Sequence, residues 1–100
     1  MGGVNSTERI LDVSLDYDLN FFNTKILPVL LNELKPCSLK LFLYLLSCNK
    51  QKIKFSFSSL YKESGVSKRG ISNAWAELVE KNFLIETQSN YFIVNIERFK

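Results

Sequence analysis

The segment SGVSKRGISNAWAELVEKNFLIE, residues 64–86, decides how this sequence is expected to fold. Gly65 suits a sharp bend because glycine tolerates positive φ values, and Ser67 stands where its hydroxyl can cap a helix. That helix is predicted from Lys68 to about Lys81. Its apolar side chains recur at spacings of three and four residues and form one face that can be buried: Ile71, Ala74, Trp75 and Leu78.

The opposite face of this predicted helix is polar and narrow. It carries Lys68, Arg69, Ser72, Asn73 and Ala76. Arginine and asparagine can form paired hydrogen bonds with guanine and adenine edges, and a helix start favours phosphate. A glycine bend between two helices with apolar faces is typical of a helix-turn-helix motif, so the segment predicts a helix held against duplex DNA.

The sequence on either side of this segment predicts both helices and strands. Residues 36–49 are rich in leucine and predict a central, buried helix. Residues 53–57 alternate between apolar and polar side chains, as in a short strand, and Ser58 or Ser59 can cap a brief helix after it. The last two strands are predicted on either side of a hairpin connection formed by Gln88, Ser89 and Asn90.

The first third of the chain predicts a further strand and helix. Residues 11–21 alternate strictly between apolar and polar side chains, which predicts a strand of eleven residues. A short helix is expected to start near Leu27, with Pro28 in its first turn. Its candidate caps are Asn23 and Thr24. The predicted order of strand, helix, helix, strand, helix, helix, strand, strand is that of an α+β fold.

Charge is distributed unevenly along the 100 residues, which are enough for one domain. Residues 1–34 carry two Lys or Arg against five Asp or Glu, a net charge of −3, and residues 35–100 carry eleven against five, a net charge of +6. Such asymmetry suggests a polyanionic partner for the basic part. Cys37 and Cys48 bracket a predicted helix and are too far apart for a disulfide, so two buried free thiols are expected.

The composition argues against an enzyme, a metalloprotein and a membrane protein. There is no histidine, no Cys/His metal spacing and no Gly-rich phosphate loop, so no catalytic residue, metal or cofactor is expected. No signal peptide and no apolar run long enough to span a bilayer is present, which favours a cytoplasmic protein. Residues 1–6 match the loose N-myristoylation pattern, but without a basic cluster lipidation is not expected.

Residues 36–96 resemble a winged helix-turn-helix DNA-binding domain. The matching pieces are SLKLFLYLLSC, IKFSF, SSLYKESGVSKRGISNAWAELVEKNFLI and YFIVNI. The resemblance implies that the second helix of the motif is the recognition helix and that the hairpin is the wing. It places Ser67, Lys68, Arg69, Ser72 and Asn73 on recognition positions, and Gln88, Ser89 and Asn90 on the wing tip.

Within that family, the sequence is similar to DNA-binding domains of phage and plasmid replication initiators and to centromere-binding adaptors of partition systems. The resemblance implies a sequence-specific binder of double-stranded DNA, acting as a partition adaptor or autorepressor. The alternatives are the DNA-binding domain of a replication initiator or transcriptional regulator, and a winged helix that docks proteins. A partner protein of a segregation or replication complex is also possible. Lys54, with its neighbours Lys50 and Lys52, could face phosphate or belong to an ordinary solvated edge.

The chain is expected to divide into an N-terminal extension, residues 1–34, and the winged helix-turn-helix domain, residues 35–100. Because the extension is strongly apolar on one side, it is expected to form a homodimer interface through part of residues 10–34. The alternative is that the strand of the extension joins the sheet within one chain.

Overall fold

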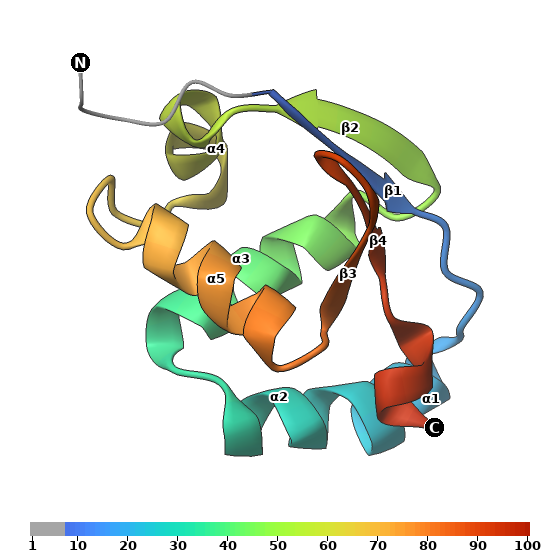
Figure 1. The fold of residues 1–100 in the computed structure, drawn as a ribbon. Coiled ribbons are helices and arrows are strands. Elements are labelled where there is room, and N and C mark those ends of the chain that lie inside the picture. Colours follow the sequence, from blue (N-terminus) through green and yellow to red (C-terminus); the bar gives the residue numbers. More distant parts are fainter. Residues whose placement is uncertain (1–7) are drawn as a thin grey trace.

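The protein has an α+β fold in which helices cover one face of a four-stranded sheet (Figure 1). The computed structural model describes residues 8–100, and the myristoylation-like pattern lies outside them. The strands are β1 (Arg9–Val13), β2 (Gln51–Phe55), β3 (Leu84–Gln88) and β4 (Tyr91–Val94). The helices are α1 (Leu19–Phe21), η1 (Phe22–Ile26), α2 (Leu27–Glu33), α3 (Pro36–Ser47), α4 (Phe57–Ser64), α5 (Ile71–Glu80) and η2 (Ile96–Phe99).

The N-terminal strand β1 lies inside the sheet, whose order is β2-β1-β4-β3. It pairs antiparallel with β2, where Leu11 stands opposite Ile53, and parallel with β4, where Leu11 stands opposite Phe92. Since both of its edges are hydrogen-bonded within the chain, β1 offers no free edge to a second subunit. The structure therefore shows the alternative in which the strand joins the sheet of its own chain.

The predicted strand over residues 11–21 is wrong beyond Val13, because β1 ends there. Its antiparallel partner β2 begins at Gln51, which stands opposite Val13, so no strand remains to pair with later residues. Beyond the end of β1, the side chain of Asn49 hydrogen-bonds the backbone of Leu15 in place of a strand. Its Oδ1 accepts the Leu15 N–H at 2.9 Å, and its amide group donates to the Leu15 carbonyl at 3.1 Å. Leu15 stays buried, but Leu19, also assigned to the apolar side of the strand, is 73% exposed.

Helical structure begins eight residues earlier than the predicted start at Leu27 and runs through α1, η1 and α2. Asp18 caps it, rather than Asn23 or Thr24: the Asp18 carboxylate accepts the Phe21 N–H at 2.8 Å. Pro28 does fall in the first turn of α2, as predicted. Before it, the Leu27 N–H reaches back five residues to the Phe22 carbonyl, in the wider π-type turn of η1.

The predicted central helix is confirmed as α3, and the next two elements, β2 and α4, are shifted by one or two residues. The strand starts at Gln51 instead of 53, after Lys50 turns the chain with a φ of 68°. Ser56 caps α4, instead of Ser58 or Ser59. It forms a capping box in which the Ser56 N–H donates to the Ser59 hydroxyl at 3.3 Å.

The core fills the space between α3, α5 and the sheet, and contains two groups of aromatic rings. Trp75 of α5 contacts Phe55 and Phe92 with ring centres 5.1 Å away in each case. Phe42 of α3 contacts Phe83 at 5.6 Å, which in turn lies beside Phe99. Ile26 and Leu30 of the N-terminal helical segment are completely buried in the same core. Residues 9–34 therefore share one hydrophobic core with the rest of the described chain.

Both cysteines are free, as predicted, but the prediction that they are buried is wrong: Cys37 is exposed and Cys48 is half-buried. Cys37 is exposed because it lies in the first turn of α3, where the helix projects beyond the core.

Candidate nucleic-acid interface

The connection between α4 and α5 holds a sharp turn at Gly65 and a second turn at residues 67–70. Gly65 has a φ of 76°, which glycine adopts without strain. The Ser67 hydroxyl and carbonyl both accept the Gly70 N–H, at 3.1 and 3.0 Å. Because these bonds close a separate turn, α5 begins at Ile71 rather than at Lys68. Lys68 and Arg69 therefore lie on the turn that leads into the helix, not on the helix itself.

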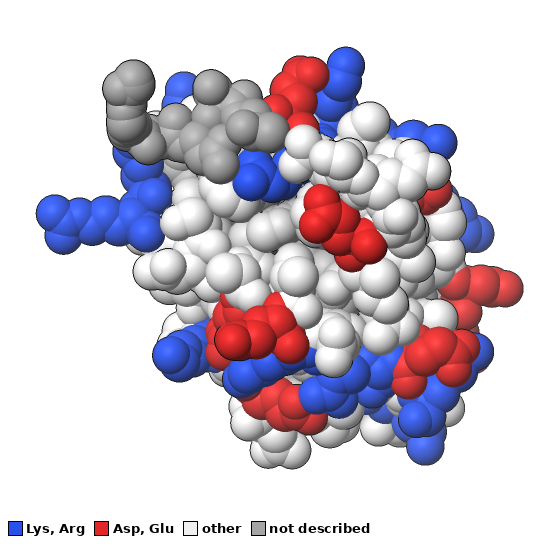
Figure 2. Space-filling view, in the orientation of Figure 1, with Lys and Arg blue, Asp and Glu red and all other residues white. Residues whose placement is uncertain are grey.

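The two faces of α5 are oriented as the sequence predicts. The apolar residues Ile71, Ala74, Trp75 and Leu78 are buried. The exposed residues are Ser72, Asn73, Ala76 and Glu80. Figure 2 shows that uncharged side chains occupy much of the centre of this side of the molecule, with charged side chains gathered mainly around it. All five predicted recognition residues are exposed: Ser67, Lys68 and Arg69 on the turn, and Ser72 and Asn73 in the first turn of α5.

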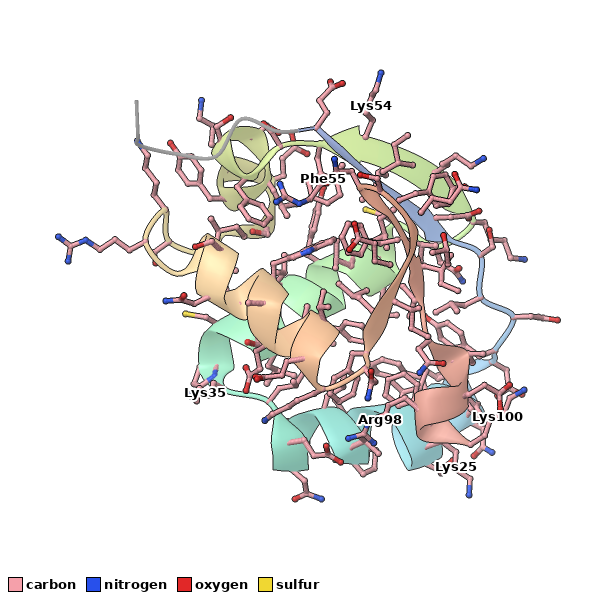
Figure 3. The ribbon with its side chains drawn as sticks, viewed as in Figure 1. Lys25, Lys35, Lys54, Phe55, Arg98 and Lys100 are labelled. Atoms are coloured by element: carbon pink, nitrogen blue, oxygen red, sulfur yellow. The ribbon has the colours of Figure 1, made fainter. Side chains whose placement is uncertain are left out.

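Helix α3 packs against both ends of the turn region. A Cβ atom placed on Gly65 would lie 3.2 Å from Cε of Lys40, and one placed on Gly70 would lie 3.3 Å from Sγ of Cys37. A groove of about 690 Å³ separates the start of α3 from α5, and Lys35, Gly70 and Asn73 are among its lining residues. Figure 3 shows Lys35 at the start of α3, on the side of the molecule where the turn region projects.

Five exposed cations surround the turn, and we name them the turn-side cations: Lys35, Lys40, Lys62, Lys68 and Arg69. Within residues 8–100, none of them takes part in a salt bridge. Sequence analysis had not assigned the first three to the site. A signal for Lys40 was present, because it is the sole charged residue between Cys37 and Cys48.

The predicted site residue Lys54 lies elsewhere. It projects from β2, at the opposite end of the molecule from Lys35 (Figure 3), and forms a salt bridge with Glu8 at 3.6 Å. The structure therefore does not bring it together with the start of α5, because β2 is the far edge of the sheet.

The predicted wing-tip residues connect β3 and β4, beside the start of β1. Asn90 adopts a φ of 61°; its N–H donates to the Glu86 carboxylate at 2.8 Å and its carbonyl accepts the Ile10 N–H at 2.9 Å. The backbone N–H of Asn90 therefore stabilises the hairpin turn, and its carbonyl binds the neighbouring strand β1. Gln88 and Ser89 are exposed, at a position separate from the residue 67–70 turn.

A second groove, of about 510 Å³, separates α5 from the hairpin, and acidic side chains line it. Glu80 comes from α5 and Glu86 from β3, while Arg9 enters from β1. The Arg9 guanidinium lies 4.1 Å from the centre of the Phe57 ring. Burial lowers the pKa of Arg9, and the nearby Glu86 carboxylate opposes that effect. Residues 84–94 contain no lysine or arginine.

Glu77 of α5 forms a hydrogen bond with Ser38, near the start of α3. Its carboxylate accepts the hydroxyl hydrogen of the buried Ser38 and lies 3.0 Å from the Lys81 ammonium. Burial alone would raise the pKa of Glu77, but the hydrogen bonds from Ser38 and Lys81 and the Lys81 charge outweigh burial, so its pKa is lowered.

Glu77→Gln is expected to make the protein less stable above the ordinary carboxyl pKa, by roughly 1 kcal/mol, because charge-assisted hydrogen bonds are lost. A carboxyl group with a lowered folded pKa stabilises above its unfolded pKa and loses that contribution as pH falls through the folded pKa. The difference in free energy of unfolding between the wild type and Glu77→Gln should therefore shrink as the pH falls. Urea denaturation at several pH values from 7 to 3 measures it. Glu97→Gln, at an exposed position, is the control. A difference that stays constant with pH would contradict this role for Glu77.

No protein-family model, curated protein or solved structure matches the chain. Among residues 8–100, no helix has both the length and the hydrophobicity needed to cross a membrane. The same residues contain no group of three side chains suited to hold a metal ion. The candidate interface therefore rests on its own geometry.

Proposed function

We propose that the protein binds double-stranded DNA at specific sequences through the residue 67–70 turn and the first half of α5. The observation that carries this proposal is the orientation of α5. Its apolar face is packed in the core, and its narrow polar face is exposed, with two cations at its start that form no salt bridge within residues 8–100.

Each exposed residue has a role in this binding mode. Lys68 and Arg69 neutralise backbone phosphates, which provides much of the affinity. Asn73 can donate to and accept from an adenine edge in the major groove, and Ser72 can bond to several bases. Ala76 is small and lets the helix approach the bases closely.

The order α3, β2, α4, α5, β3, β4 supports a winged helix-turn-helix reading, with α5 as the recognition helix and the β3–β4 hairpin in the place of the wing. The role proposed for such a stand-alone binder is plasmid or phage maintenance, as a centromere-binding adaptor or an autorepressor. A homodimer would suit a two-part DNA site. Because β1 is paired on both edges, its interface would use the helical segment 19–33, where Leu19 and Leu31 are 73% and 61% exposed.

The test is a selection from random duplex DNA, followed by titration of the selected site at several salt concentrations. We expect log affinity to fall steeply with log salt. Asn73→Ala should weaken binding to the selected site by about 1–3 kcal/mol and relax its preference at one base pair. Arg69→Ala should weaken binding to all duplexes and make the salt slope less negative by about one.

Lys25→Ala is the control, because Lys25 lies at the far end of the molecule (Figure 3) and should leave the titrations unchanged. A flat salt response of the wild type, with no enriched sequence, would contradict DNA binding and favour a protein-docking role.

A further inference from the structure

The cations and acids on the two sides of α5 are arranged asymmetrically. On the α3 side lie the turn-side cations, which come from three elements and form no salt bridge within the described residues. The groove on the hairpin side is lined by Glu80, Glu86 and Arg9, and residues 84–94 of the hairpin carry no cation. Cations that form no salt bridge are therefore more numerous around the turn and the start of α3 than beside the hairpin, and a polyanion beside α5 is attracted more strongly toward the turn and α3.

The position of Lys40 is fixed by the packing of α3 on the turn. Cys37 and Lys40 are one helical turn apart on α3, and they contact opposite ends of the 65–70 connection, next to Gly70 and Gly65. The Lys40 side chain therefore lies beside Gly65, at the start of the connection that carries Lys68 and Arg69.

Lys35 reaches the same surface from the start of α3. It lines the groove that Asn73 of α5 also lines. Two acidic residues, Glu77 and Glu80, line this groove as well. Glu77 is already compensated by Lys81 at 3.0 Å and by the Ser38 hydroxyl. Lys35 forms no salt bridge within residues 8–100, so its ammonium can interact with a ligand in or beside the groove.

We propose that Lys35 and Lys40 of α3 bind backbone phosphates of the DNA strand that runs along the α3 side of the recognition surface, and that the hairpin binds none. This inference rests on the proposed function and deepens it. The duplex then lies toward α3, with the Lys35 contact beside the base-reading residue Asn73, whose groove Lys35 shares. The β3–β4 hairpin then serves to hold β1 and close the core, rather than to contact a second groove.

The test compares the salt slopes of the variants Lys35→Gln, Lys40→Gln and the double variant with that of the wild-type protein on one duplex. Each single variant should make the slope less negative by about one, and the double variant by about two. The affinity of the double variant for the duplex near physiological salt should fall by about tenfold or more. Because both side chains are exposed, thermal unfolding should stay unchanged, which separates lost contacts from misfolding.

Two controls address the other side of the molecule. Ser89→Asp puts an acid on the hairpin tip, and Lys54→Gln removes a cation that Glu8 already pairs. Both should leave the slope as in the wild type. As an independent measurement on the unmodified protein, acetylation of lysines with and without DNA should show protection of Lys35 and Lys40 but not of Lys54.

The outcomes separate the two proposals. A flat salt response of the wild type overturns DNA binding itself. A steep response that the double variant leaves unchanged overturns only the α3 contacts. A strong loss of affinity in Ser89→Asp shows that the hairpin contacts phosphate and also overturns this inference.

Discussion

Trp75→Ala is expected to lower the free energy of unfolding by about 3–5 kcal/mol, because a large buried aromatic side chain is removed from a core that cannot fully collapse. Trp75 is 4% exposed, and its ring contacts Phe55 and Phe92 at 5.1 Å and Phe57 at 6.0 Å. It therefore ties α5 to β2, β4 and α4 at once. Domains of this size are stable by only about 5–15 kcal/mol, so the loss is a large fraction of the total.

Urea denaturation followed by circular dichroism measures this effect without relying on the fluorescence of the replaced tryptophan. The midpoint of thermal unfolding should fall by roughly 12 °C or more. Leu43→Ala is the control, since Leu43 is 37% exposed and lies outside the proposed dimer interface, so its loss should cost about 1 kcal/mol or less. Equal midpoints for wild type and Trp75→Ala would show that α5 is not anchored by this ring.

Leu11→Asp is expected to abolish cooperative folding. Leu11 is completely buried in β1, between β2 and β4, so the carboxylate would lose its hydration without gaining a partner. The combined loss of apolar burial and of hydration is on the order of 5 kcal/mol, which is comparable to the whole stability of a small domain. Thermal melting and amide dispersion in NMR spectra measure the outcome.

Ile10→Asp is the matched control in the same strand. Ile10 points to the other face of the sheet and stands opposite Lys54 of β2, so an aspartate there is partly solvated and has a cation nearby. It should melt cooperatively, at a moderately lower temperature. If Leu11→Asp also melted cooperatively, β1 would not be part of the core.

Helices α3 and α5 could be predicted because their periodicity extends over several turns. Helix α3 is long and rich in leucine, and α5 has four apolar residues at regular spacing, so their existence and the buried face of α5 follow from the pattern alone. Gly65 marks the bend because few other residues accept its backbone conformation. The exposed side of α5, and with it Ser72 and Asn73, could be assigned for the same reason.

The N-terminal strand shows where a local pattern misleads. The alternation of apolar and polar residues continues to Phe21, but a strand extends only as far as it has partners. The side chain of Asn49 binds the backbone at Leu15, just after β1 ends, and the side chain of Asp18 caps the helix that follows. Asp18 was a visible capping signal, whereas the bonds from Asn49 to Leu15 depend on tertiary structure.

The candidate site was incomplete for a similar reason. Lys68 and Arg69 could be found because they adjoin the bend in sequence. Lys35 and Lys40 belong to another helix, and their proximity to the turn depends on how α3 packs against Gly65 and Gly70. Lys54 lies apart from them because β2 forms an edge of the sheet, and the sequence alone does not indicate which edge a strand occupies.

The parallel pairing of β1 with β4 affects how the chain can fold during synthesis. Ile10 and Tyr91 are adjacent in the sheet although eighty residues separate them along the chain. As the polypeptide leaves the ribosome, β1 emerges first but must wait for β4 before the sheet can close around it, and contacts between such distant residues form slowly. Helices α3 and α4 can form meanwhile. Helix α5 packs fully against the sheet only after β4 has been synthesised, so the proposed DNA-binding surface also reaches its final shape only then.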